Sequence, residues 1–246
     1  MGKRSGVEIR GKTAFYLFRA ETQKFFDAHS TALEYPRGAT LFREGEACGA
    51  VFALVSGKVK VSTASPAGRT IILRLAQPGD TLGMSAAMIG QRYKATADAT
   101  EPSKVRILPV RFLNEMLERY PAAAVAIARE IAGNYRTVVE GTRIIALPPS
   151  PAGRLAQLLL NWAADGGRKA NGAIVMPLTH QELAQMTATT RETITRTFGR
   201  LQKGRIIDRK GTAIHIVDEA ALERLSSDPK QPRRQISPKT VRKTEA

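Results

Sequence analysis

The chain of 246 residues has a single cysteine, Cys48, and only three histidines. One thiol cannot form a disulfide within the chain, and so little cysteine is typical of a protein kept in a reducing cytoplasm. No group of cysteine, histidine and carboxylate residues has metal-site spacing, and no glycine-rich loop of the P-loop kind is present. We therefore expect no metal, no enzyme activity and a cytoplasmic location.

Long apolar runs are also missing. No stretch approaches the roughly 18 apolar residues of a membrane span, and the charged N-terminus is not followed by the apolar region of a signal peptide. We expect no membrane partner, a flexible basic arm at 1–12 and a disordered basic tail at 227–246.

Acidic residues are scarce beside basic ones, with 22 Asp and Glu against 38 Lys and Arg, which leaves a net charge of +16. Residues 179–216 carry +4, the tail +4 and the arm +3, so these three segments supply 11 of the 16 charges. Such a balance favours a polyanion as partner.

The most informative segment begins at Thr179. Thr179 and Glu182 have the spacing of a capping box, which predicts the start of a helix. A turn follows at 187–189, and Thr190 can cap a second helix. Residues 206–216 then alternate like a hairpin with a basic tip. This order predicts a winged helix-turn-helix that binds double-stranded DNA.

The second helix has two different faces. At about 100° per residue, four polar residues fall within an arc of roughly 140°, and three apolar residues fall opposite them. The polar residues are Arg191, Glu192, Thr195 and Arg196, and the apolar ones are Ile194, Phe198 and Leu201. Arg matches guanine, Glu matches the cytosine amino group, and Thr offers a methyl group or a hydroxyl. We predict that the polar four read bases.

Further residues suit the DNA backbone rather than the bases. The predicted phosphate contacts are Thr179, Arg200, Lys203, Arg205, Arg209 and Lys210. A solvated amphipathic helix with ordinary surface charges is the alternative, but it would not need two caps, a turn and a basic hairpin in this order.

Residues 13–110 differ from this pattern after a helical start at 13–30. Glycine recurs every 7 to 12 residues between short apolar alternations, as at 54–61 and 71–75. Several short strands at this spacing predict a small antiparallel barrel or jelly roll. The fold class is therefore α+β.

Residues 111–147 are predicted to form one long helix. Apolar residues spaced by 3 and 4 follow a heptad pattern, which is typical of a dimer coiled coil. The predicted seam is Ile127, Ile131, Asn134, Val138, Gly141 and Ile145, preceded by Tyr120 and Ala124. A helix packed on its own β-domain is the alternative. Prolines at 148, 149 and 151 end the helix. Ser150 can cap the next helix, and the DNA-binding domain is expected to span 148–226.

The segment Thr190-Arg191-Glu192-Thr193-Ile194-Thr195-Arg196 resembles the recognition helix of the CRP/FNR family of bacterial transcription regulators, and the resemblance extends over about residues 20–226. Ala188 departs from it, since the family's turn has glycine there. The resemblance implies a β-roll sensor domain, a dimerisation helix, a near-palindromic site and contact with RNA polymerase, with 165–172 as the candidate loop. Arg191, Glu192 and Arg196 lean towards a TGTGA-like half-site, and Thr195 towards a TTGAT-like one.

The resemblance also places a candidate effector pocket. Its residues are Gly83, Met84, Ser85, Tyr93, Lys94, Val139 and Glu140. A cyclic nucleotide is disfavoured because Met84 replaces the ribose acceptor of family members that bind one, and Tyr93-Lys94 replaces their Arg-Ser or Arg-Thr pair. Arg92 or Lys94 could still contact a phosphate.

Effectors other than a cyclic nucleotide would need other ligand residues. An iron–sulfur cluster needs about four cysteines, which excludes it, and haem is disfavoured by the scarcity of axial ligands. Cys48 as a redox switch, an unnamed effector and no effector at all remain open. The alternative function is a ligand-binding signalling protein that uses its helix-turn-helix mainly for protein contacts.

Overall fold

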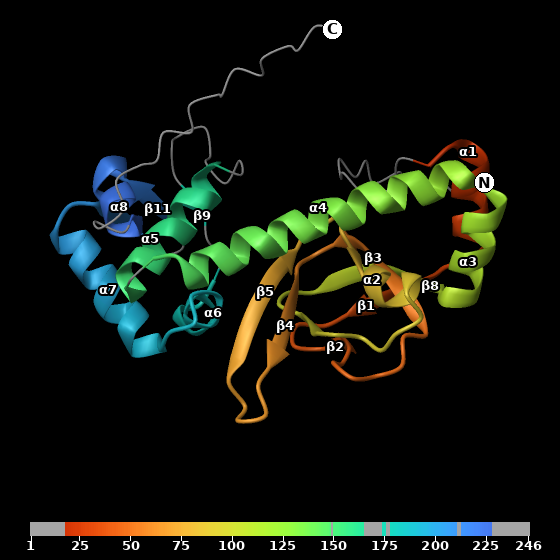
Figure 1. The fold of residues 1–246 in the computed structure, drawn as a ribbon, viewed down its shortest axis with the longest axis horizontal. Coiled ribbons are helices and arrows are strands. Elements are labelled where there is room, and N and C mark those ends of the chain that lie inside the picture. The colour runs from red at the N-terminus through yellow and green to blue at the C-terminus, as the bar shows by residue number, and fades with distance from the viewer. Residues whose placement is uncertain (1–17, 149, 165–173, 176–177, 211–212, 228–246) are drawn as a thin grey trace, which may run out of the picture.

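A β-roll lies at one end of the computed structural model and a small helical domain at the other, with one long helix running between them (Figure 1). The described residues are 18–148, 150–164, 174–175, 178–210 and 213–227. The predicted arm at 1–12, the loop at 165–172 and the tail at 228–246 lie outside them. Within the described residues, no helix is both long and apolar enough to cross a lipid bilayer.

The β-roll consists of two four-stranded antiparallel sheets, with strand orders β1-β8-β3-β6 and β2-β7-β4-β5. The strands are β1 (Thr31–Tyr35), β2 (Thr40–Phe42), β3 (Ala50–Ser56), β4 (Val59–Ala64), β5 (Thr70–Ala76), β6 (Thr81–Leu82), β7 (Thr96–Ala99) and β8 (Ser103–Pro109). Helix α1 (Ala20–His29) precedes the sheets, and α2 (Met84–Met88) lies between β6 and β7. The predicted β-roll is confirmed.

The predicted strand, turn and strand at 54–61 form, but they do not make a hairpin. Strand β3 pairs with β6 and β8, whereas β4 pairs with β5 and β7. The turn at Gly57 carries the chain from one sheet to the other. Its φ is +90°, and a Cβ there would overlap Ser103 Oγ and lie 2.6 Å from the Pro102 carbonyl oxygen. Only glycine fits this turn without a backbone shift.

The single helix predicted at 111–147 is wrong, because the structure has two. Helix α3 (Val110–Arg119) and helix α4 (Pro121–Ala146) are separated by Tyr120, which belongs to neither. Proline lacks an amide hydrogen and disfavours helical geometry in the residue before it. Tyr120 accordingly has φ −128° and ψ 81°. Helix α3 packs on the β-roll instead, with Leu113 and Met116 fully buried.

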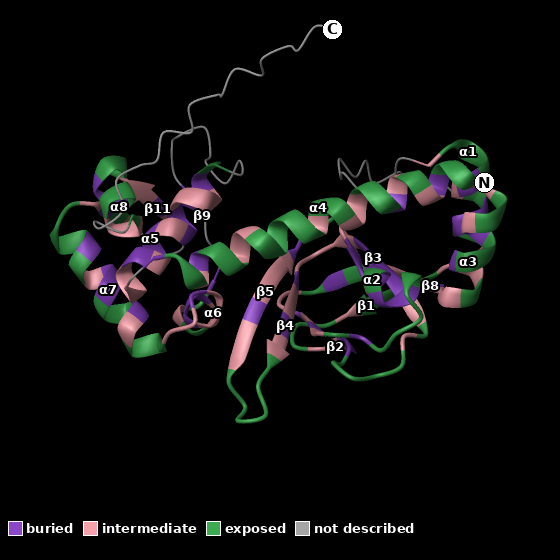
Figure 2. Ribbon diagram, in the orientation of Figure 1, coloured by how far each residue is buried: buried purple, intermediate pink, exposed green. Residues whose placement is uncertain are grey.

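Helix α4 contributes to the cores of both domains. Ile127 is completely buried in the β-roll core, and Ile144 is buried in the core of the DNA-binding domain. Gly141 faces β5, since a Cβ there would lie 3.6 Å from the Leu73 carbonyl oxygen. The predicted seam is therefore wrong at Ile127, which cannot also contact a second copy. The face of α4 turned away from the roll is exposed (Figure 2).

The C-terminal domain is a helical layer with a small three-stranded sheet of order β10-β11-β9. Its elements are α5 (Pro151–Trp162), β9 (Ile174–Val175), α6 (His180–Met186), α7 (Arg191–Lys203), β10 (Ile207–Lys210), β11 (Ala213–Ile216) and α8 (Glu219–Ser226). The predicted cap at Ser150 forms, since its hydroxyl oxygen accepts from the Gly153 amide at 3.0 Å.

Candidate functional site

The first helix of the motif starts with the predicted capping box. Thr179 Oγ1 accepts from the Glu182 amide at 3.1 Å, and the Glu182 carboxylate accepts from both the amide and the hydroxyl of Thr179 at 2.8 Å. The single hydroxyl proton of Thr179 is thus used inside the cap. While the cap is closed, this hydroxyl has no proton for a DNA phosphate, which weakens the predicted phosphate contact.

The turn between α6 and α7 contains the residue that departs from the family's pattern. Ala188 has φ +48°, in the left-handed region that glycine adopts without strain. The Thr187 hydroxyl donates to the Leu183 carbonyl at 2.7 Å, and the Thr189 amide donates to the Ala184 carbonyl at 2.9 Å. These bonds fix the turn, and Ala188 bears the strain of its left-handed conformation.

Helix α7 turns the predicted reading face towards solvent. Arg191, Glu192, Thr195 and Arg196 are all exposed. The opposite face is buried in the domain core, with Ile194 at 0%, Phe198 at 2% and Leu201 at 3% exposure. The orientation predicted from helical spacing is correct, and the four polar side chains stand together on an open surface.

The carboxylate on this face is held ionised. The pKa of Glu192 is lowered by the backbone amide at the helix start, then by the Thr190 hydroxyl, and also by Arg191 and Arg196. An ionised carboxylate only accepts hydrogen bonds. At neutral pH, Glu192 is therefore suited to a donor such as the cytosine amino group.

Sequence reasoning missed His180, which links α6 to α7 and to the wing. His180 Nδ1 lies 2.8 Å from Thr195 Oγ1, and Nε2 lies 2.6 Å from an Arg209 Nη1. The imidazole stacks on Phe198 with ring centroids 5.3 Å apart, and the Arg209 guanidinium lies 4.9 Å from the same centroid. The sequence signal was a histidine at the first position of a helix that packs beside the reading helix.

The hydrogen bonds determine the tautomer of His180. A guanidinium can only donate, so Nε2 must accept and Nδ1 must carry the proton. Nδ1 therefore donates to the Thr195 hydroxyl oxygen, while the Thr195 hydroxyl donates to the Arg191 carbonyl at 2.9 Å. Burial, then Arg209 and Arg191, lower the pKa of His180 and keep it neutral. Thr195 has no proton left for a base, so its methyl group and the second lone pair of its hydroxyl oxygen are the groups that remain for base reading.

The predicted phosphate contacts are in different states. Arg200, Lys203 and Arg205 are exposed on or just after the C-terminal half of α7 and available to an anion. Arg209 is half-buried and engaged with His180 and Phe198, so it supports the wing rather than standing free at its tip. The Lys210 side chain and residues 211–212 lie outside the described residues.

The predicted effector residues of the β-roll do line one cavity. It has a volume of about 390 Å³ and is bounded by α2, the segment after it, β5 and α4. Gly83, Met84, Ser85, Tyr93 and Lys94 all belong to it. On α4 the lining differs from the prediction, because Asn134, Tyr135 and Val138 line the cavity, whereas Val139 and Glu140 do not.

Two of the residues that line this cavity, Met84 and Tyr93, present few free polar atoms to it. Met84, at the place of the ribose acceptor, is buried in the apolar core at 3% exposure. Tyr93 is buried as well; its hydroxyl donates to the Ala50 carbonyl at 2.6 Å, and its ring stacks on Phe42 at 4.1 Å. Burial raises the pKa of Tyr93, so it stays a neutral phenol. Neither residue offers the acceptor or the cation that a ribose phosphate needs.

Comparison with known proteins matches both halves of the chain. A cyclic nucleotide-binding domain family matches residues 32–120, and a Crp-like helix-turn-helix domain family matches residues 153–225. The transcriptional regulator LdrP of Thermus thermophilus is 31% identical over 193 residues, which cover 77% of this chain and 94% of that protein. A CRP-like cAMP-activated global transcriptional regulator of Mycobacterium tuberculosis is 29% identical over 197 residues, with coverage of 78% and 86%.

Solved structures show the same arrangement of domains. A CRP-family transcriptional regulator from Thermus thermophilus superposes with a TM-score of 0.62 at 28% identity, covering 79% of this chain and 96% of that chain. FixK2 from Bradyrhizobium japonicum superposes with a TM-score of 0.70 at 21% identity, covering 81% and 98%. The likeness to FixK2 is one of fold.

Proposed function

Because the chain belongs to the CRP/FNR family of DNA-binding transcription regulators, we propose that it acts in the cytoplasm as a homodimer that reads a near-palindromic DNA site with α7. The observation that carries this proposal is the reading face, where Arg191, Glu192, Thr195 and Arg196 project together from a helix anchored by its apolar side. Two such helices related by a twofold axis would read half-sites about one helical turn apart.

The homodimer is supported by an apolar stripe on α4 that nothing in the described chain covers. Its residues are spaced by 3 and 4, as in a coiled coil. The stripe consists of Val125, Ala128, Ala132, Tyr135, Val139, Thr142 and Ala146. Tyr135 is 71% exposed and Val125 is 53% exposed. This stripe is rotated by roughly 100° from the seam expected from the sequence, at 100° per residue, because the β-roll covers the expected face.

Charge placed on the stripe tests the dimer. We expect Val139→Glu to give a monomer in sedimentation, because each copy would bring a carboxylate into an apolar contact. Glu115→Lys changes charge at an exposed position on α3, outside the helix that carries the stripe, and should leave the dimer intact. A dimeric Val139→Glu protein would show that another surface joins the copies.

DNA titration tests the reading face. We expect Arg196→Ala and Glu192→Ala to lose the preference for a specific duplex over a scrambled one, because both remove base-edge contacts. Arg200→Ala should weaken binding to both duplexes about equally and lower the salt dependence by about one counterion. Full selectivity in Arg196→Ala would contradict the assignment. Contact with RNA polymerase through residues 165–172 remains part of the proposal and requires a transcription assay.

We propose further that the β-roll cavity does not take a cyclic nucleotide. This rests on the buried Met84 and Tyr93 described above, although Arg92 and Lys94 stand exposed at its edge. Cyclic AMP and cyclic GMP should leave the melting temperature unchanged at concentrations that saturate a cyclic-nucleotide-responsive relative. A saturable rise would overturn the proposal.

A further inference from the structure

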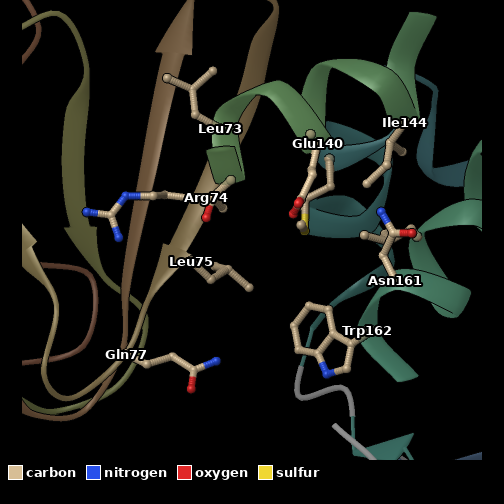
Figure 3. Close-up of a pocket in the computed structure, with 12 residues that line it drawn as sticks. Leu73, Arg74, Leu75, Gln77, Glu140, Ile144, Asn161 and Trp162 are labelled. Atoms are coloured by element: carbon tan, nitrogen blue, oxygen red, sulfur yellow. The ribbon is translucent and has the colours of Figure 1, made fainter. Parts of the chain in front are cut away.

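A second cavity lies between the β-roll and the DNA-binding domain, apart from the one inside the roll. It has a volume of about 270 Å³. Its walls come from β5, α4, α5 and α6, and so from both domains (Figure 3). Cavities at domain interfaces are common places for small ligands.

Most of the wall is apolar. Leu73 and Leu75 face the cavity from β5, and Ile144 and Leu158 from the helices. The indole of Trp162, the single tryptophan of the chain, forms the end of the cavity near α5. These residues suit a small ligand with an apolar or aromatic body.

One of the charges at the wall of this cavity is only weakly compensated. Two side chains at its wall carry charge, Arg74 and Glu140. The Arg74 guanidinium points away (Figure 3) and is used, donating to Asp80 at 3.0 Å and to the Thr81 carbonyl at 2.8 Å. Among the residues that the structure describes, Glu140 has a single ion pair, a long one of 3.7 Å with Arg136, whose side chain is 81% exposed. The carboxylate of Glu140 therefore remains available to a ligand.

From these residues, we propose that the interdomain cavity binds a small organic cation, a protonated amine with an apolar or aromatic body. The carboxylate of Glu140 would pair with the ammonium group, and the face of Trp162 attracts cations as well as apolar rings.

The cavity stays accessible in the proposed dimer. Glu140 and the exposed apolar stripe of α4 lie on different sides of the helix, roughly 100° apart at 100° per residue. A ligand in the cavity would touch β5 and α5 together and hold the two domains in their present docking. This cavity is separate from the one inside the β-roll, so the proposal does not depend on whether a cyclic nucleotide binds there or on which DNA sequence is read.

The fluorescence of Trp162 provides a direct test. Three probes of similar size, 2-phenylethylamine, 2-phenylethanol and phenylacetate, are titrated into the full-length protein near pH 7. We expect a saturable change with the amine, and binding at least tenfold weaker for the alcohol and the acid. Glu140→Gln should remove the preference for the amine, while Glu115→Gln, an exposed change on α3, should retain it.

Each other outcome overturns the proposal. Equal responses to amine and alcohol would leave only an apolar cavity, and no saturable response to the amine would leave one filled by water. A preference that survives in Glu140→Gln would place the cation elsewhere. Circular dichroism of the variant, together with its DNA affinity, shows whether it is folded and separates failure of this site from failure of the proposed DNA binding.

Discussion

The Arg69 guanidinium donates a hydrogen bond of 2.8 Å to the carbonyl oxygen of Ala188, although the two residues are 119 positions apart. Arg69 belongs to the loop between β4 and β5 of the β-roll, and Ala188 is the left-handed residue of the turn before the recognition helix. The β-roll thus touches the helix-turn-helix at the turn between α6 and α7.

Removing this contact should loosen the turn. A hydrogen bond of this kind contributes about 1 kcal/mol, so Arg69→Ala should speed hydrogen exchange of the amides at 187–190 about fivefold. Mass spectrometry of exchange measures this peptide by peptide. Arg69→Lys keeps a cationic donor, so its exchange rate should lie between those of the wild-type protein and Arg69→Ala. Arg43 is another exposed arginine of the β-roll, and Arg43→Ala should leave the exchange rate unchanged. An unchanged exchange rate in Arg69→Ala would show that this hydrogen bond does not stabilise the turn.

The strain at Ala188 predicts that glycine stabilises the protein there. The left-handed conformation costs a residue with a Cβ about 1 kcal/mol. Glycine avoids this cost, but its unfolded chain has more conformational entropy, which offsets part of the gain in stability. Ala188→Gly should raise the melting temperature by up to about 2 °C. Glu115→Gly, in the exposed interior of α3, should lower it, since glycine weakens helices by up to about 1 kcal/mol. The same sign for both variants would contradict a strained turn.

The His180 network predicts a pH dependence of stability. Its pKa in the folded protein lies below the usual value of about 6.5. The unfolded chain therefore takes up the proton first as the pH falls, so stability is full above about pH 6.5 and decreases below it, down to the folded pKa. Protonation would also set an N–H against the Arg209 guanidinium.

Denaturant unfolding at pH 5.5 and pH 7.5 measures this effect. The wild-type protein should lose more stability between the two pH values than His180→Gln, which keeps a donor and an acceptor but does not titrate. His29 and His215 are common to both proteins, so the difference isolates His180. Equal losses would mean that His180 is not held neutral.

Because the proton of the Thr195 hydroxyl is used within the protein, we predict that Thr195 reads a base through its methyl group. Thr195→Val keeps a methyl group and should bind the site normally, whereas Thr195→Ser should bind about fourfold more weakly, the equivalent of about 0.8 kcal/mol for one buried methyl. Replacing the contacted thymine by deoxyuridine should weaken the wild-type protein similarly and leave Thr195→Ser unaffected. A normal Thr195→Ser protein and a weakened Thr195→Val would show that the hydroxyl reads the base instead. In Thr195→Val, the His180 N–H loses its acceptor, which lowers the stability of that variant. The DNA affinities are therefore compared at a temperature at which both variants are folded.

Features that depend on neighbouring residues could be predicted from the sequence. The caps at Thr179, Thr190 and Ser150 involve partners three residues away, and all three form as expected. The apolar side of α7 follows from helical spacing alone. The helix break before Pro121 could also be predicted from the sequence, because proline disfavours a helical residue before it. The heptad spacing continues across Pro121 and favours one long helix instead.

Features that depend on contacts between distant residues could not be predicted in this way. Spacing shows that α4 has apolar residues on several sides, but not which side the β-roll covers, and Ile127 was therefore assigned to the wrong contact. Likewise, a basic residue beside a turn looks free for phosphate until its neighbours are known. Arg209 stacks on Phe198 and bonds to His180, 29 residues earlier, which no local pattern shows.

Leu75 belongs to the β-roll by sequence, yet it packs against the core of the DNA-binding domain, as does Ile144 of the connecting helix. The boundary between the two functions is therefore not a boundary between two folding units. Heat should unfold both halves in a single cooperative calorimetric transition, because neither can melt without exposing apolar surface of the other. A substitution that weakens the β-roll should thus lower the amount of folded DNA-binding domain, even when it leaves every DNA contact intact.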